Sequence, residues 1–325
     1  MLISFEEASK LITDGKLLHI AGTEALLKKL PKGKWVGGST EYFMAKEGGK
    51  VSGDLLFVTG FPEGKSVYEK CKIKSYDMQN IHQISTDAYE NGFSILIVPF
   101  DSAVHKEYAQ NGSGYENMFM RHIVGWISGL NLEKQGQTPV AVNGLTGEIF
   151  SDKAVALHLQ TREDKTVSIN IINIFEQDTS SPVIEFTDEG FRITKCLVDG
   201  KEVVFADYIE KNKIDTKLPL VGDYSGNGVN ISFKTIENGV VNFYAPVFAG
   251  IQYRIAKPVS DYADLFNKHI SEHKGETSVF SCNCILNFLY GGLENKKIES
   301  FSGPITFGEI AYQLVNQTLV YVEVM

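Results

Sequence analysis

The chain has 325 residues, of which 43% are hydrophobic and 22% are charged, which is the usage of an ordinary globular protein. Its 40 acidic and 31 basic residues give a formal net charge of −9, so no basic surplus exists to neutralise a nucleic acid or an anionic membrane. A chain of this length buries a sizeable core without disulfides or metals, and corresponds to about two domains or one large one.

The N-terminal segment and the cysteines favour a cytoplasmic location. The start, MLISFEEASK, has neither the basic nor the apolar region of a secretory signal. The strongest apolar run, Phe93–Phe100, has eight residues, whereas a membrane helix needs about 20. The four cysteines do not have the spacing of a disulfide framework. We therefore expect a cytoplasmic protein that contacts neither membrane nor nucleic acid.

The first part of the chain reads as alternating helices and strands. Ser4 and Glu7 have the spacing of a capping box at the start of a helix. The pattern further predicts strands over Leu17–Ala21, Leu55–Thr59 and Ile95–Phe100, and helices over Glu24–Leu30, Ala103–Ala109 and Tyr115–Gly129. Trp35 to Thr40 reads as a glycine-rich turn after a short strand.

From Pro139 onward, strands predominate. Asn238-Gly239 predicts a type I′ turn that joins strands Val229–Phe233 and Val240–Ala245. Further strands are expected over Val140–Val142, Ala154–Leu159, Val167–Phe175, Val203–Tyr208, Ser278–Ser281 and Leu319–Val324, with a helix over Asp261–His273 and another beginning at Cys284. The expected fold is mixed α+β, with layered sheets and helices.

Two short patterns recur along the chain. Gly37-x-x-Thr40 precedes one strand and Gly303-x-x-Thr306 precedes another. The strand that ends at Phe100 and its following helix also resemble the strand that ends at Ser281 and the helix after it. These recurrences indicate two pseudo-duplicated halves. We expect regions 1–138 and 139–325 to pack as one unit.

The carboxyl ends of two predicted strands are candidate ligand sites, because ligands gather there in sheets backed by helices. Asp101-Ser102 follows one strand, and Cys282-Asn283 follows the other. Ser102 and His105 could suggest a hydrolase, but no G-x-S-x-G surrounds Ser102. Capping of the following helix is the better interpretation of Asp101 and Ser102, and it leaves ligand contact open.

The cysteines near the C-terminus allow two chemical interpretations. Cys282 at a helix start could be a nucleophile, although a small buried cysteine is the more frequent case. Cys282-x-Cys284 with His269 and His273 could ligate a metal, but the second ligand pair of a zinc site is lacking. We therefore expect no metal site and no cofactor.

Other candidate motifs are weaker. Gly37-Gly38-Ser39-Thr40 lacks the lysine of a phosphate-binding loop, and Gly222 to Gly228, which reads as a polar loop, has no third glycine of a dinucleotide fingerprint. Arg254 could clamp an acidic ligand, but pairing with a structural carboxylate is the more common role of such an arginine.

The last fifty residues resemble the C-terminal part of the FIST domain. The matching segments are Phe280-Ser281-Cys282-Asn283, the stretch Ser302 to Ile310 (SGPITFGEI), and Asn316-Gln317-Thr318. In the N-terminal half, Gly37 to Thr40 stands where FIST proteins have a Gly-x-Ser-Thr turn, and Ile95 to Asp101 where they have a central strand. The family's Gly-Arg is replaced by Cys284-Ile285, and no Gly-Glu-Ile follows Thr40. The chain looks like a divergent bacterial relative.

The resemblance implies a sensory domain that binds a small ligand, with an amino acid or small carboxylate proposed. No output domain is visible, so a signal would pass to a separate partner protein. The pocket that we predict from it is formed by Cys282, Asn283, Glu309, Asp101, Ser102, Gly37, Gly38 and Thr40. In this pocket Glu309 would hold an ammonium group, and the amides after Cys282 would hold a carboxylate.

Two alternatives remain open. A Cys282-dependent acyl-transfer or hydrolase-type enzyme would need a thiol of depressed pKa. A protein-interaction module would expose an apolar patch. We favour a non-enzymatic ligand binder, and a homodimer agrees with the frequency of twofold assemblies.

Overall fold

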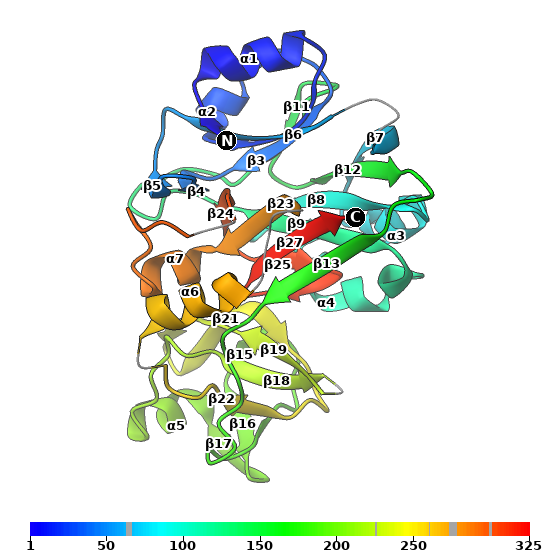
Figure 1. The fold of residues 1–325 in the computed structure, drawn as a ribbon. Coiled ribbons are helices and arrows are strands. Elements are labelled where there is room, and N and C mark those ends of the chain that lie inside the picture. The colour runs from blue at the N-terminus through cyan, green and yellow to red at the C-terminus, as the bar shows by residue number, and fades with distance from the viewer. Residues whose placement is uncertain (63–66, 225, 260, 273–277, 299–300) are drawn as a thin grey trace.

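The computed structural model describes residues 1–62, 67–224, 226–259, 261–272, 278–298 and 301–325. Over these residues the chain forms a body of three six-stranded sheets and a lobe with one six-stranded and one three-stranded sheet. Figure 1 shows this lobe at one end of the molecule and helix α1 (Phe5–Thr13) at the other. The fold class is mixed α+β, as the sequence predicts.

The body is built, within the described ranges, from three units with the same order of elements: an outer strand, a helix, a first central strand, a second helix, a second central strand, a hairpin and a return strand. Unit 1 consists of β1 (Leu2–Ile3), α1, β2 (Leu17–Gly22), α2 (Glu24–Leu27), β3 (Trp35–Ser39), β4 (Tyr42–Ala45), β5 (Gly48–Val51) and β6 (Leu56–Phe61).

Unit 2 repeats this order with longer elements. It consists of β7 (Tyr68–Tyr76), α3 (Ile84–Asp87), β8 (Gly92–Pro99), α4 (Ala103–Asn111), β9 (His122–Ser128), β10 (Ala141–Asn143), β11 (Glu148–Phe150) and β12 (Ala154–Thr161). Short 3-10 turns accompany α3 and α4.

Unit 3 contains the lobe as an insertion after its outer strand. It consists of β13 (Val167–Ile172), α6 (Tyr262–Glu272), β23 (Ser278–Cys284), α7 (Ile285–Tyr290), β24 (Gly303–Thr306), β25 (Glu309–Ala311), β26 (Gln313–Val315) and β27 (Leu319–Val324). The lobe between β13 and α6 consists of β14 (Ile184–Glu185), β15 (Gly190–Ile193), β16 (Lys195–Val198), β17 (Lys201–Val204), α5 (Phe205–Lys211), β18 (Leu220–Tyr224), β19 (Asn227–Ile231), β20 (Phe233–Glu237), β21 (Val240–Val247) and β22 (Tyr253–Ile255).

Each sheet of the body takes its hairpin from another unit. The two central strands of a unit pair in parallel, and its return strand pairs antiparallel with the first of them. The hairpin of unit 2, β10–β11, then extends the sheet of unit 1 at β3. In the same way β25–β26 extends the sheet of unit 2, and β4–β5 extends the sheet of unit 3. The exchange of hairpins is therefore cyclic.

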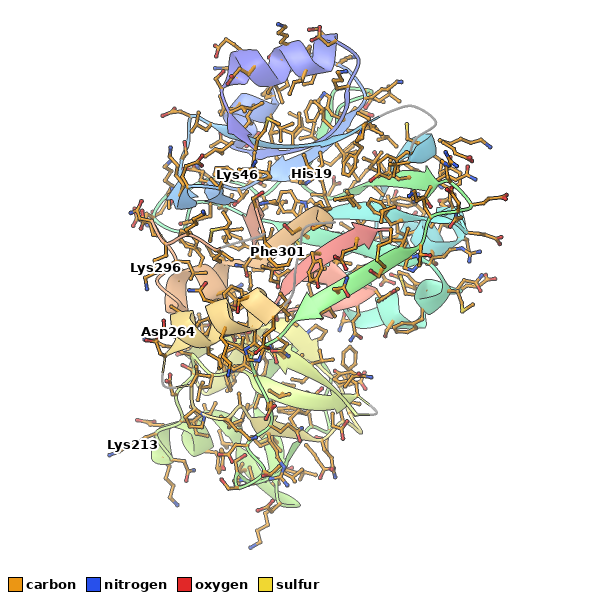
Figure 2. All side chains as sticks on the ribbon, in the orientation of Figure 1. His19, Lys46, Lys213, Asp264, Lys296 and Phe301 are labelled. Carbon is orange, nitrogen blue, oxygen red and sulfur yellow. The ribbon has the colours of Figure 1, made fainter. Side chains whose placement is uncertain are left out.

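The three sheets pack against one another in the middle of the body. His19 of β2 lies edge-on to Trp126 of β9 and to Phe280 of β23, with ring centroids 5.6 and 5.2 Å apart. The indole Nε1 of Trp126 donates a hydrogen bond of 2.9 Å to Nε2 of His19. Figure 2 labels His19 within the body. One side chain from each sheet thus forms the centre of the core.

The second central strands converge at their carboxyl ends, where hydrogen bonds join them in a ring. The amide of Gly129 donates to the carbonyl of Ser39 at 2.8 Å, and the amide of Phe307 donates to the carbonyl of Ile127 at 3.0 Å. The hydroxyl of Thr40 closes the ring by donating to the carbonyl of Ile305 at 2.8 Å. Polar groups therefore collect at this end of the sheets.

Several local predictions are confirmed. Ser4 and Glu7 form the capping box of α1, and β27 has the predicted bounds Leu319–Val324. Asn238 and Gly239 have φ values of 51° and 76°, as a type I′ turn requires, although the turn joins β20 to β21 rather than the earlier strand. The predicted helix Asp261–His273 is α6, and its last residue lies outside the described residues.

Other local predictions are wrong. Most of the predicted polar loop Gly222 to Gly228 belongs to the paired strands β18 and β19. The helix expected over Tyr115–Gly129 is strand β9 after a 3-10 turn, because a short, fully buried apolar run has no periodicity that separates helix from strand. Most of the predicted strand Val203–Tyr208 belongs to helix α5. The glycines of the predicted turn Trp35 to Thr40 lie inside strand β3.

The internal repeat is threefold where the sequence pattern indicated two halves. The recurring segments around Thr40 and Thr306 are the second central strands of units 1 and 3. The strand that ends near Phe100 and the strand that contains Ser281 are the first central strands of units 2 and 3. Each recurrence therefore relates two of three copies. The division into regions 1–138 and 139–325 stays a prediction.

The helices in the described part of the chain lack the combination of length and apolar character that crossing a bilayer requires.

Candidate functional site

The structure places the residues predicted for one pocket in separate surroundings. Glu309 and Asn283 lie in the interior of the body, and Asp101 and Ser102 lie at the start of α4. Thr40 lies at the ring of strand ends. The only space beside Cys282 and Asn283 among the described cavities has a volume of about 10 Å³, which is room for about one water molecule.

Glu309 belongs to a buried polar cluster. One carboxyl oxygen accepts a hydrogen bond from the Thr306 hydroxyl at 2.8 Å, and the other accepts from the Thr318 hydroxyl at 2.9 Å. Burial raises the pKa of Glu309 to about 8, although the hydrogen bonds from Thr306 and Thr318 oppose that rise. The carboxyl group therefore keeps its proton at neutral pH.

Cys282 lies inside strand β23 and not at a turn before a helix. Its side chain is 1% exposed, and the Sγ atom is 3.4 Å from the carbonyl oxygen of Gly125. Burial, together with the nearby Glu309, raises the pKa of the thiol well above its ordinary value. These surroundings are the opposite of those that activate a cysteine nucleophile.

We expect iodoacetamide to modify Cys71 first in the folded protein and Cys282 only after unfolding. Cys71 is partly exposed, whereas Cys196, Cys282 and Cys284 are buried. Peptide mass mapping of protein alkylated with and without urea measures this order. Rapid modification of Cys282 in the native state would contradict the structural role and restore the enzymatic alternative.

Ser102 caps α4, which confirms the capping interpretation. Its hydroxyl accepts from the His105 amide at 3.1 Å and donates to the Pro99 carbonyl at 2.6 Å. Asp101 adopts a positive φ of 59° and forms an ion pair of 2.9 Å with Lys106. Gly38 packs closely under another sheet, since a Cβ there would lie 2.6 Å from Ile97.

The other weak candidates have structural partners. The guanidinium of Arg254 donates to the carbonyl of Ser181. Nδ1 of His269 lies 2.9 Å from the carbonyl oxygen of Leu265. Within the described ranges no three His, Cys, Asp or Glu side chains gather as a metal would require, and His273 lies outside those ranges.

A cavity of about 540 Å³ lies at the carboxyl ends of β2 and β3. We call it the loop-covered cavity, because its outer wall is the connection of residues 129–140 between β9 and β10. The corresponding connections in the other units, 40–41 and 307–308, have only two residues. The longer connection of unit 2 therefore forms a wall that the short connections of units 1 and 3 cannot form. The cavity is lined by Thr23, Glu24, Ala25, Ser39, Thr40, Glu41, Gly53, Asp54, Gly129, Leu130, Asn131, Lys134, Gly136, Gln137 and Thr138.

Glu41 is the buried charge of this cavity, with its side chain 4% exposed. Lys134 Nζ donates to both carboxylate oxygens, at 2.9 and 2.7 Å. Asn131 Nδ2 donates at 2.9 Å and Gln137 Nε2 at 3.4 Å. Burial alone would raise the pKa of Glu41, but these donors outweigh it and lower the pKa below the ordinary value. Glu41 is therefore ionised, and its side-chain donors come from the covering loop.

The hydroxyls of Ser39 and Thr40 already form hydrogen bonds within the fold. Ser39 donates to the Gly129 carbonyl at 2.9 Å and accepts from the Val140 amide at 2.9 Å, and Thr40 accepts from the Tyr42 amide at 3.2 Å. Glu24 and Asp54 are exposed, and no ion pair involves either of them in the described part of the chain. The cavity thus presents carboxylates together with one lysine.

The comparison with protein families identifies a relationship over nearly the whole chain. The model of DUF6976, described as a family of unknown function, matches residues 3–325. The chain belongs to the DUF6976 family. No curated protein matches the chain. The DUF6976 assignment includes no link to the FIST domain, so that resemblance stays a prediction.

The sequence patterns missed the residues that define the cavity of this DUF6976 protein. Glu41 directly follows Thr40, which the patterns did select, but no local signal distinguishes a buried carboxylate from an exposed one. The polar stretch after the predicted helix Tyr115–Gly129 contains Asn131, Lys134 and Gln137. No motif in that stretch selected these residues. A polar connection of twelve residues between two buried strands is the signal that could have found them.

Proposed function

We propose that this DUF6976 protein binds a small molecule with both an ammonium and a carboxylate group, such as an amino acid, in the loop-covered cavity. The observation that carries the proposal is the pairing of Glu41 with Lys134, whose charges have the same two chemical types as such a ligand. The ligand's ammonium group would take the place of Lys134 at Glu41, and Lys134 would then pair with the ligand's carboxylate.

The charges around the cavity support this exchange. A buried carboxylate needs a cationic partner at all times, because leaving it unpaired is costly. Lys134 is 51% exposed, so its long side chain can leave Glu41 and remain solvated. Glu24 and Asp54 add negative charge on the wall that an incoming ammonium group would pass. An exchange of partners therefore keeps Glu41 paired in both states.

A sensory role follows if the exchange of partners at Glu41 changes the conformation of the covering loop, residues 129–140. Asn131, Lys134 and Gln137 hold residues 129–140 against Glu41 in the present state. A ligand that takes over some of these contacts would release or re-order the loop at the surface, where a separate signalling protein could detect it. This role, which the FIST resemblance implies, and the cytoplasmic location are parts of the proposal.

Removing the charge of Glu41 should weaken ligand binding. We expect a thermal-shift screen of the amino acids to identify a ligand, since a ligand at 100 times its Kd stabilises a fold by about 2.7 kcal/mol. Glu41→Gln should raise the Kd of that ligand by roughly tenfold or more, because a charge-assisted contact contributes about 1.5–3 kcal/mol. Lys134→Met removes the partner of the ligand's carboxylate but also the cation that competes for Glu41, so it should change the Kd less than Glu41→Gln does. Titration calorimetry measures both.

The matched controls are Glu47→Gln and Lys29→Met, which change the same charges at exposed positions outside the cavity. These variants should bind the ligand as the wild type does. An affinity that is the same in Glu41→Gln and in the wild type would refute the proposed site. If no amino acid stabilises the wild-type protein, the proposed ligand class is wrong.

A further inference from the structure

A second cavity of about 600 Å³ lies between the body and the lobe. The body contributes Phe100, His105 and Lys106 at the carboxyl end of β8 and the start of α4. The lobe contributes residues of β15, β20 and β21, among them Arg192, Lys234 and Tyr244. We call it the interlobe cavity. It is separate from the loop-covered cavity and shares no lining residue with it.

The charged side chains of the interlobe cavity have an excess of one positive charge. Lys106, Arg192 and Lys234 line it, together with the carboxylates of Asp101 and Glu237. The ion pair with Lys106 compensates Asp101. Among the described residues no carboxylate forms an ion pair with Arg192 or Lys234. Two cations on the lobe are therefore available to a negatively charged ligand.

His105 adds a buried hydrogen-bond donor at the same cavity. Its side chain is part of a residue that is 2% exposed, and its Nδ1 accepts a hydrogen bond of 3.3 Å from the Asp101 amide. Burial lowers the pKa of the imidazole to about 4, so the neutral ring carries its proton on Nε2. Nε2 is buried and has no hydrogen-bond partner in the described structure. A buried donor without an acceptor is costly, and a ligand oxygen would relieve that cost.

Aromatic rings form the flat parts of the wall. The ring of Phe100 lies 5.5 Å from that of His105 and 6.2 Å from that of Tyr244, and Phe191 lies 5.7 Å from His105 on the lobe side. Nζ of Lys234 lies 4.8 Å from the centroid of Phe100. Lys234 thus lies over the face of Phe100, and a cation beside aromatic rings suits a ligand with a flat ring and an attached anion.

We propose that the interlobe cavity binds a small aromatic carboxylate. The carboxylate lies between Arg192 and Lys234, and the ring packs against the aromatic wall. Nε2 of His105 is covered in the unliganded structure, so a small rotation of the imidazole must accompany binding for Nε2 to donate a hydrogen bond to the carboxylate. Because the ligand contacts both the body and the lobe, its binding also fixes their contact. The cavity is the counterpart of the loop-covered cavity in the repeat, since both lie at the carboxyl end of a first central strand. The two proposals are independent of each other.

Titration calorimetry with benzoate as the probe tests this site, with benzamide and acetate as controls for the charge and for the ring. We expect saturable binding of one benzoate per chain, and at least tenfold weaker binding of benzamide and acetate. Arg192→Gln and Lys234→Gln should each raise the Kd of benzoate by roughly tenfold, because each removes a charge-assisted contact from an exposed side chain that the fold does not need. Lys201→Gln should leave the affinity unchanged, since Lys201 is exposed on β17, at the end of the lobe remote from the body (Figure 1).

The role of His105 is tested by NMR in the unmodified protein, because a variant at a buried position could fail to fold. Benzoate should shift the imidazole Nε2–H signal of His105, and the shift should need higher benzoate concentrations in Lys234→Gln. No binding of benzoate, equal binding of benzamide or acetate, or an unchanged affinity in both lobe variants would overturn the proposal. Binding without any shift of the His105 signal would overturn the assignment of the histidine.

Discussion

Gly125→Ala should abolish the folded state. Gly125 lies in the middle of β9, directly opposite Leu96 of β8 in the parallel pair of unit 2. A Cβ at this position would lie 1.9 Å from the carbonyl oxygen of Leu96, and that oxygen belongs to backbone, so no side chain can move aside. We expect destabilisation of about 4 kcal/mol or more, which is comparable to the whole stability of many domains.

Circular dichroism and urea unfolding measure this effect, and Gly114→Ala is the matched control. A Cβ at Gly114 has no heavy atom within 4 Å and the residue has no positive φ, so the control should change the free energy of unfolding by less than about 0.5 kcal/mol. A folded Gly125→Ala with wild-type stability would show that β8 and β9 do not pair in the register described here.

Glu309→Gln should change how stability depends on pH. The pKa of Glu309 is about 8 in the folded protein, against an ordinary value of 4.5. Between these two values the unfolded chain loses the proton and the folded protein keeps it. Ionisation therefore stabilises the unfolded state, and the folded protein loses about 1.4 kcal/mol per pH unit as the pH rises. Below pH 4.5 the effect is absent, and above pH 8 it is constant.

Urea unfolding at pH 5.5 and pH 7.5 measures the difference. Over these two pH units the wild type should lose about 2.7 kcal/mol relative to Glu309→Gln, because glutamine cannot ionise. Glu47→Gln, at an exposed position, should follow the wild type. If the stability of Glu309→Gln falls in parallel with that of the wild type, the carboxyl group is not held in its protonated form.

Predictions that rest on a few neighbouring residues agree with the structure. The capping box needs only Ser4 and Glu7, and the turn at Asn238-Gly239 needs only two residues that tolerate positive φ. The final strand, Leu319–Val324, is a run of residues with high strand propensity. Each of these features is determined by local backbone and side-chain chemistry, so a single sequence contains the necessary information.

The arrangement of the three units depends on contacts that are remote in sequence. Strand β3 pairs with β10, and β4 pairs with β24, which lies about 260 residues later. The units also differ in length, because unit 2 has the long connection 129–140 and unit 3 contains the lobe. Short apolar strands at equivalent positions of the three units share no residue pattern. Only two of the recurrences could therefore be recognised in the sequence.

The predictions of site residues differ in the same way, since some needed only local information and others depended on remote contacts. Thr40 was selected through the FIST resemblance and Asp101 because it follows a strand, and each lines one of the two cavities. Cys282 and Asn283 were selected for the same reason as Asp101, but β23 continues to Cys284 and carries both into the interior. An error of three residues in a strand end therefore decides whether a side chain meets a ligand or the core.

Because of the cyclic exchange of hairpins, each sheet is complete only when strands from another unit have been made, and this affects folding during synthesis on the ribosome. The sheet of unit 1 can close once β11 has emerged, but the sheet of unit 2 needs β25 and β26, and that of unit 3 needs β27. Until β25 is made, β9 has an open edge that another chain could pair with. We therefore expect slow folding, and aggregation of chains truncated before β25.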